Sequence, residues 1–272
     1  MSLHSMLYDT SLYQQNNLSP QNINLRPPQI FHIPKFYNEH KDELEKVFSL
    51  LSDDESRMIF AARIRSVITG NLCYIKLSGY AQYFHPETIP QKDDIIIDGG
   101  VSHDTSVEEK FSILVGNNGR IYSFEPDPTC YYQASEKIST IKNITLIPLG
   151  LSNKSECVDF ISDGYASRIA ETPPFYNTIT CQMTTIDTVV SQYNIENVDI
   201  IKLDVEKSEL KALLGGVSAI SKFKPKLIIC IYHRLNDVFE LPLFINDFGL
   251  NYKFYIGHHS PTLWETVLYA KI

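Results

Sequence analysis

The sequence has no cysteine pair at Cys-x-x-Cys spacing, no excess of positive charge and no long hydrophobic run. Its five cysteines are scattered, and an odd number of scattered cysteines is more typical of reduced thiols than of a disulfide framework. The formal charge of -8 argues against nucleic acid as a partner, because phosphate backbones attract basic surfaces.

Membrane insertion and secretion are not indicated either. The longest apolar runs, such as Leu227 to Tyr232, are far too short to span a bilayer. The polar N-terminus also lacks the basic-then-apolar order of a secretory signal. We therefore expect a cytoplasmic protein without a membrane span.

The 272 residues are enough for one large domain with an extension. Residues 1–34 are rich in Asn, Gln, Ser and Pro, which predicts an extended arm. Residues 35–79 carry apolar side chains at helical spacing on both sides of a polar break at 52–54, which predicts two helices. Residues 80–272 form the expected main domain, and its first segment, 80–90, is predicted to cross the mouth of that domain.

Within the main domain, short apolar strands alternate with amphipathic helices. The expected strands are 95–98, 120–125, 144–149, 199–204 and 226–232, and the expected helices are 106–115, 128–139, 186–193, 208–220 and 241–248. This alternation predicts an α/β fold with a parallel sheet covered by helices on both faces. The last two strands, 252–256 and 266–270, are too close for a crossover helix and should pair antiparallel. Segments 157–161 and 178–183 predict an inserted hairpin that would cover the site.

The first chemical signal is the turn Asp98-Gly99-Gly100 at the end of a strand. Glycines there let a ligand approach the backbone, and the amides that open the next helix favour negative groups. Asp98 can orient these amides or accept hydrogen bonds from a cofactor amine. Glu125, at the end of the next strand, can accept hydrogen bonds from both hydroxyls of a ribose. A tight turn without a ligand and a solvated acid are the alternatives.

A second group of polar residues follows two later strands. Asp204 and Glu206 end one buried strand, and His233 ends the next. The carboxyl ends of parallel strands line the ligand crevice, so these residues could position a nucleophile, take its proton or hold a divalent cation. The alternatives are acids favoured by a helix start and a histidine of ordinary loop polarity.

Three further residues are candidates for contact with a substrate. His258 and His259 fill the turn before the last strand, and Tyr83 lies in the segment that should cross the mouth of the domain. Exposed turn residues and packing at the domain edge are the alternatives. We assign no metal site, because no third ligand falls at a familiar spacing, although a magnesium ion at Asp204 and Glu206 stays open.

Five segments in this order resemble the FkbM-type S-adenosylmethionine-dependent methyltransferases. The resemblance covers about residues 80–272, and the two helices before it are similar to the N-terminal extension of some members. The segments are Asp98-Gly99-Gly100, Ser123 to Pro126, Ile201 to Glu206, Tyr232-His233 and His259 to Tyr269.

The resemblance implies a class I methyltransferase fold, Rossmann-like, with a seven-stranded and mostly parallel sheet that ends in an antiparallel hairpin. It also implies S-adenosylmethionine as the methyl donor and transfer to a hydroxyl of a small molecule, sugar, glycan or secondary metabolite. The cofactor-binding residues it implies are Asp98, Gly99, Gly100, Ser102, Glu125, Pro126, Gly150, Leu151, Ser152 and Asp204. As our own hypothesis for the mechanism, the catalytic base is His233 or Asp204, and Glu206 orients the acceptor.

The sequence departs from the family pattern at two positions. Asp104 stands where a third glycine is usual, and Lys207 where a glycine commonly follows Asp-Val-Glu. These departures leave a non-catalytic binding protein as one alternative. A nicotinamide-dependent oxidoreductase is the other, although the Gly-x-Gly-x-x-Gly spacing is missing and the predicted hairpin ending argues against it. The N-terminal arm and helices could mediate a homodimer.

Overall fold

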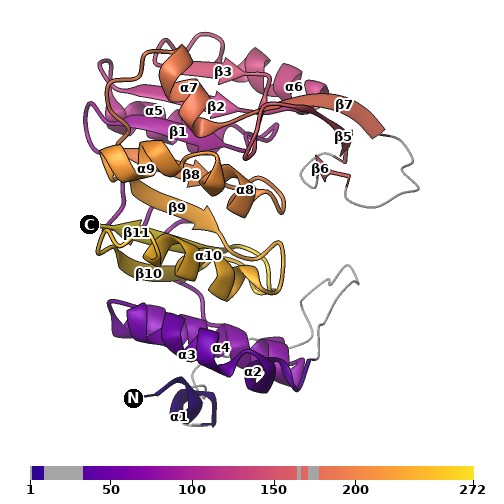
Figure 1. The fold of residues 1–272 in the computed structure, drawn as a ribbon, viewed down its shortest axis with the longest axis vertical. Coiled ribbons are helices and arrows are strands. Elements are labelled where there is room, and N and C mark those ends of the chain that lie inside the picture. Colours follow the sequence, from indigo (N-terminus) through magenta and orange to yellow (C-terminus); the bar gives the residue numbers. More distant parts are fainter. Residues whose placement is uncertain (1, 9–32, 164–166, 171–177) are drawn as a thin grey trace.

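The main feature of the fold is one sheet of seven strands in the order β10-β11-β9-β8-β1-β2-β3. The computed structural model describes residues 2–8, 33–163, 167–170 and 178–272 (Figure 1). The strands are β1 (Ile95–Gly99), β2 (Arg120–Phe124), β3 (Ile144–Ile147), β8 (Ile200–Leu203), β9 (Lys226–Cys230), β10 (Lys253–His258) and β11 (Thr266–Lys271). All neighbours pair in parallel except β11, which is antiparallel to β9 and β10. The predicted antiparallel ending is thus confirmed.

Helices cover both faces of this sheet. Successive residues of each central strand point to opposite sides, and because they are mostly apolar, both sides have to be buried. Ile96 and Ile228 belong to an apolar cluster that includes Phe111 of α5, whereas Ile97 and Ile229 belong to a larger cluster on the other face. The helices of the main domain are α5 (Ser106–Val115), α6 (Pro128–Ile138), α7 (Ile186–Gln192), α8 (Glu209–Leu214), α9 (Val217–Phe223) and α10 (Asp237–Asn246).

The N-terminal extension packs against the β10 end of the sheet (Figure 1). It contains α2 (Phe36–Glu39), α3 (Lys41–Leu50), α4 (Asp54–Thr69) and a 3-10 turn, η3 (Leu72–Tyr74). The predicted break lies between α3 and α4, where the Asp53 side chain accepts a hydrogen bond from the amide of Ser56. The buried Arg63 of α4 donates to Thr266 of β11 across 2.7 Å. Apolar residues of α3 and α4 also belong to the larger cluster, so the extension and the sheet share one core.

Two expectations differ from the observed elements. Residues Leu3–Tyr8 of the expected arm form a helix, α1, whose Leu3 and Leu7 are buried; the prolines of the arm all lie further along the chain, and residues 9–32 are outside the described part. The expected helix 208–220 is divided into α8 and α9 at Gly215 and Gly216. A Cβ at Gly215 would lie 2.1 Å from the carbonyl oxygen of Ser152, so this close approach requires glycine.

The predicted hairpin is present as β5 (Cys157–Ile161) and β7 (Thr178–Thr184), which pair antiparallel. It is part of a second sheet with β4 (Gly150–Leu151) and β6 (Arg168–Ile169), in the order β4-β7-β5-β6. The sequence pattern does not indicate the two-residue strands β4 and β6, because two residues are too few to show an alternation. Among the described residues, no helix is long and apolar enough to cross a membrane.

The close contact at Gly215 predicts that Gly215→Ala lowers the free energy of unfolding by about 1–3 kcal/mol, because the added methyl group displaces backbone. Gly79→Ala is the matched control, since no atom lies within 4 Å of a Cβ at that position. Urea unfolding followed by circular dichroism measures both variants. Equal stability of the two variants would contradict this interpretation of the helix break.

Candidate active site

A cavity of about 640 Å³ lies beyond the carboxyl ends of β1, β2 and β8, a size typical of sites for small ligands. Figure 1 shows these strands side by side, in the order β8-β1-β2, in the half of the sheet that ends at β3. The predicted site residues that line the cavity are Tyr83, Gly100, Ser102, Glu125, Pro126, Gly150, Leu151, Asp204 and Glu206. Asp98, Gly99, Ser152, His233, His258 and His259 are outside this lining.

The glycine turn is pressed against the end of β8. Gly100 has a φ of +88°, and a Cβ there would lie 1.8 Å from the carbonyl oxygen of Asp204. The amide of Asp204 donates to the carbonyl of Gly99 across 3.0 Å, and the amide of Gly100 donates to Phe124. Only glycine fits at this position, so the backbone itself forms this part of the cavity wall.

Beneath the turn, a buried ion pair joins β1 to β8. Lys202 Nζ lies 3.0 Å from Asp98 Oδ1 and donates to the carbonyl of Gly100 across 2.9 Å. Ser123 donates to Asp98 Oδ2. Because both oxygens of Asp98 are engaged within the protein, its contact with a cofactor stays a prediction. The sequence analysis gave Lys202 no role, although a lysine inside an apolar strand signals a buried partner.

Two acids on the cavity wall, Glu108 and Glu125, form no ion pair within the described part of the chain. Glu108 of α5 is buried, and its Oε2 has no hydrogen-bond partner. Burial, together with the nearby charge of Asp98, raises the pKa of Glu108 well above its usual range. Burial also raises the pKa of Glu125 to about 8, although Glu125 accepts a hydrogen bond from the amide of Asp127. Both carboxyl groups are therefore available to donors of a ligand, and the sequence analysis missed Glu108.

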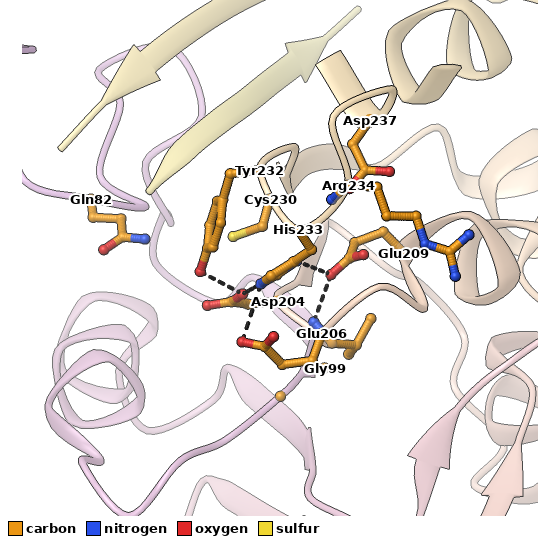
Figure 2. A network of polar contacts seen from close by, with 12 residues as sticks. Gln82, Gly99, Asp204, Glu206, Glu209, Cys230, Tyr232, His233, Arg234 and Asp237 are labelled. Atoms are coloured by element: carbon orange, nitrogen blue, oxygen red, sulfur yellow. Dashed lines mark hydrogen bonds and ion pairs between the residues drawn. The ribbon is translucent and has the colours of Figure 1, made fainter. Parts of the chain in front are cut away.

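On the opposite side of the cavity, three acids surround His233 (Figure 2). His233 Nε2 lies 3.3 Å from Asp204 Oδ1 and 3.2 Å from Glu206 Oε1, while Nδ1 lies 2.8 Å from Glu209 Oε1. Burial alone lowers the pKa of His233, but Glu209, Glu206 and Asp204 outweigh this effect and raise it well above its usual range. The structure thus brings the three predicted catalytic residues together.

Two tyrosines hold the Asp204 carboxylate in this cluster. Tyr83 donates to Oδ2 across 2.6 Å, and Tyr232 donates to Oδ1 across 3.1 Å. Burial opposes ionisation of Asp204, but the positive charges of His233 and Lys202 and the Tyr83 hydrogen bond keep its pKa below the usual range. Tyr83 lines the cavity as expected, and its hydroxyl acts on a site residue.

The turn after β8 has a strained backbone. Glu206 and Lys207 have backbone φ angles of +47° and +77°, a range that residues other than glycine rarely adopt. Lys207, which stands where the family commonly has glycine, therefore has a backbone conformation suited to glycine. Its side chain does not close the cavity. Asp104, the other departure, lies exposed at the cavity rim and accepts a hydrogen bond from the amide of Ser106.

The cavity also contains residues that the sequence analysis overlooked. Trp264, which received no role in the sequence analysis, lines the cavity and meets Tyr232 edge to face with ring centroids 5.9 Å apart. Gln82 and Phe160 line it as well, which places the β5–β7 hairpin at its wall. The sequence contains a single tryptophan, and its position in the segment after His258 and His259 could have indicated that it belongs to the site.

The two adjacent histidines are not exposed turn residues as the alternative for them supposed. His258 ends β10 and is buried, with Nδ1 2.7 Å from Thr266 Oγ1 and Nε2 2.7 Å from the carbonyl of Thr262. Burial lowers the pKa of His258 to about 3. His259 is partly buried, and its Nε2 lies 3.0 Å from the hydroxyl of Tyr269. Their contact with a substrate stays a prediction.

Comparisons with known proteins agree with this architecture. Residues 94–254 match the family described as Methyltransferase FkbM domain. Methyltransferase FkbM from Methylobacillus flagellatus KT has a similar structure, with a TM-score of 0.70 and 25% identity over 86% of this chain. The chain spans 59% of the length of that protein. The sheet order and this similarity confirm the expected class I methyltransferase fold.

Two further solved structures have lower similarity to this chain, and no conclusion is based on them. A fibrillarin pre-rRNA processing protein from Methanococcus jannaschii has a TM-score of 0.43 and 16% identity over 78% of this chain and 73% of its own. Aeropyrum pernix fibrillarin with bound S-adenosyl-L-methionine has a TM-score of 0.41 and 16% identity over 66% of this chain and 67% of its own. No curated protein matches the sequence.

The strained turn predicts that Lys207→Gly raises the free energy of unfolding by about 1 kcal/mol, because glycine adopts positive φ without a steric cost. Lys211→Gly is the control: it places glycine within helix α8 and should lower the same quantity by about 1 kcal/mol. Chemical denaturation compares the two. A loss of stability in Lys207→Gly would show that the lysine side chain is needed there.

The raised pKa of Glu125 predicts a pH dependence of stability. The folded protein holds this proton more tightly than the unfolded chain does, so the contribution is complete below about pH 4.5 and is lost as the pH rises through about 8. Glu125→Gln should therefore reduce the fall in unfolding free energy between pH 5 and pH 9. Glu196→Gln, at an exposed position, should leave that fall as in the unmodified protein. An unchanged pH dependence in Glu125→Gln would contradict the burial argument.

Proposed function

The chain belongs to the FkbM methyltransferase family, and from this premise we propose that it transfers a methyl group from S-adenosylmethionine to a hydroxyl oxygen. The acceptor we propose is a sugar, a glycan or a secondary metabolite. The observation that carries the proposal is the arrangement of the cavity. Its wall has a glycine turn and the acids Glu108 and Glu125 on one side, and an acid–histidine cluster on the other.

The residues of the first side fit a nucleoside with an amino acid tail. The buried Glu108 Oε2 has no hydrogen-bond partner and can accept a hydrogen bond from an amino group. Glu125 follows β2, where a carboxylate can accept hydrogen bonds from ribose hydroxyls. Gly150 and Leu151 of β4 line the cavity next to Pro126 and offer an apolar surface for an adenine ring.

The chemistry divides between the ligand and the chain. When bound, S-adenosylmethionine supplies a methyl group on a positively charged sulfur. The chain aligns the acceptor oxygen with that methyl group, and such alignment contributes up to about 7–11 kcal/mol to lowering a barrier. As the oxygen–carbon bond forms and the carbon–sulfur bond breaks, the acceptor proton passes to the Asp204–Glu206–His233 cluster. General base action of this kind contributes about 100-fold to 10,000-fold.

Aromatic residues support an acceptor with an extended ring or sugar face. Trp264 is 46% exposed although it lines the cavity, which leaves a flat apolar surface free. Tyr232 connects this surface to Asp204 through its hydroxyl. An acceptor that stacks on Trp264 would therefore present its hydroxyl groups to the cluster.

No observation favours the two alternatives. The antiparallel end of the sheet and the absence of Gly-x-Gly-x-x-Gly do not support a nicotinamide-dependent oxidoreductase. Asp104 and Lys207 leave the cavity open, which supports a catalytic protein over a non-catalytic one. A cytoplasmic location and a homodimer stay predictions.

We expect the purified chain to bind S-adenosylhomocysteine in calorimetric titrations and not to bind NADH. Glu125→Gln should weaken binding about 3-fold to 10-fold, since the amide replaces one acceptor oxygen by a donor and a neutral hydrogen bond is worth about 0.5–1.5 kcal/mol. Glu196→Gln should bind as the unmodified protein does. Binding of NADH alone would contradict the proposal.

Turnover is tested by release of S-adenosylhomocysteine with a panel of sugars and polyketide alcohols. With an active acceptor, Asp204→Asn should lower the rate about 100-fold to 10,000-fold. Glu206→Gln, at a residue without a predicted cofactor contact, should also slow turnover while its affinity for S-adenosylhomocysteine stays within about threefold. Full activity of Asp204→Asn, Glu206→Gln and His233→Gln would remove the cluster from the mechanism.

A further inference from the structure

We propose that Asp204, Glu206 and His233 bind a divalent transition-metal ion. One ligand atom from each residue, a carboxylate oxygen or a ring nitrogen, lies within 4.8 Å of the others, and no ion is present. The residues come from the ends of two adjacent strands, β8 and β9, and converge at one point (Figure 2). The sequence did not indicate this site, because His233 lies 27 residues beyond Glu206 and has no ligand spacing.

The distances between the side chains suit a common ion. Two ligands that bind one ion at about 2.0–2.2 Å lie about 3.0–3.5 Å apart in tetrahedral or octahedral geometry. His233 Nε2 is 3.3 Å from Asp204 Oδ1 and 3.2 Å from Glu206 Oε1. All three ligand atoms lie within 4.8 Å of one another, so binding of an ion would require the two carboxylates to move closer together.

The state of His233 is the independent sign of a ligand. Its side chain is buried, and neither ring nitrogen forms a hydrogen bond of acceptable geometry, although each contacts a carboxylate. A buried polar atom without a hydrogen bond is costly unless another partner satisfies it. A metal ion at Nε2 would be that partner.

The surroundings of the three residues resemble the outer shell of a metal centre. Glu209 Oε1 lies 2.8 Å from His233 Nδ1 and also accepts a hydrogen bond from the amide of Val205. A carboxylate at one ring nitrogen fixes the ring so that the other nitrogen faces a metal. Tyr83 and Tyr232 hold Asp204 in the same way.

The backbone supports this assignment. Glu206 has a φ of +47°, and its carboxylate faces the cavity, where it is part of the lining. Strained backbone of this kind is concentrated at functional sites, where the surrounding structure holds it in place. The side chains of Asp204 and Glu206 are 20% and 25% exposed, so the cavity side of an ion stays open to a further ligand.

The donor set decides the class of ion. Two carboxylates and one imidazole suit Mn²⁺, Fe²⁺, Co²⁺ or Zn²⁺, whereas Mg²⁺ and Ca²⁺ prefer oxygen ligands alone. An ion at this point would hold the hydroxyl of an acceptor and lower its pKa, so that the proton would pass more easily to a carboxylate oxygen of the cluster that does not bind the ion. This role rests on the proposed function, but binding of the ion does not.

The test is titration of the full chain, freed of metal with EDTA and dialysed, with MnCl₂ followed by electron paramagnetic resonance. We expect one tight site per chain. Asp204→Asn and Glu206→Gln should each weaken binding at least 10-fold, and Glu209→Gln about 10-fold to 100-fold, as found for residues that position metal ligands. Asp104→Asn, in an exposed acid at the rim of the same cavity, should bind within twofold of the unmodified chain.

Circular dichroism melting confirms that each variant is folded before titration. The proposal is overturned if neither Mn²⁺ nor Zn²⁺ binds to the unmodified chain at 1 mM. It is also overturned if Asp204→Asn and Glu206→Gln bind Mn²⁺ as tightly as the unmodified chain does. The cluster would then be a network of ion pairs. If Mn²⁺ and Zn²⁺ do not bind while S-adenosylhomocysteine binds and methyl transfer proceeds in EDTA, the metal site is wrong and the proposed function stands. If Mn²⁺ binds at the cluster but no acceptor is methylated, the metal site stands and the function is wrong.

Discussion

The contact between the glycine turn and the end of β8 is the constraint on which the site depends. Gly100 lies so close to the carbonyl of Asp204 that no side chain fits between them. Lys202 reinforces this contact, because its ammonium group binds both Asp98 and the carbonyl of Gly100. The turn that should receive a cofactor and the strand that presents Asp204 are thus one rigid unit. A movement of either would change the distance between the two halves of the cavity.

The rest of the fold holds this unit in place from both sides. The Lys202–Asp98 pair is buried, so removing one partner would leave an unpaired charge in the core. The N-terminal helices pack against β10 and share the larger apolar cluster with the sheet. On the other face, Tyr83 spans from the smaller cluster to Asp204. The segment before β1 therefore contributes to the site as well as to the core.

Local patterns predicted the fold well and the contacts poorly. Helix α5 and the strands β1, β2, β8 and β9 follow from apolar runs and helical spacing, which are properties of adjacent residues. The break at Gly215 depends on Ser152, and the burial of His258 depends on Thr266, so neither could be seen in a single segment. The same limit applies to Glu108, whose importance comes from its burial next to Asp98.

The site was predictable as a set of strand ends, because ligands of open parallel sheets bind there. What the sequence could not predict was the convergence of His233 on Asp204 and Glu206, which depends on the pairing of β8 with β9.

The most direct test of the central claim is a crystal structure with S-adenosylhomocysteine. We predict density for the nucleoside along Gly100, with its ribose hydroxyls on Glu125 and its sulfur facing the cluster of Asp204 and His233. An empty cavity, or a nucleoside whose sulfur faces away from that cluster, would contradict the account.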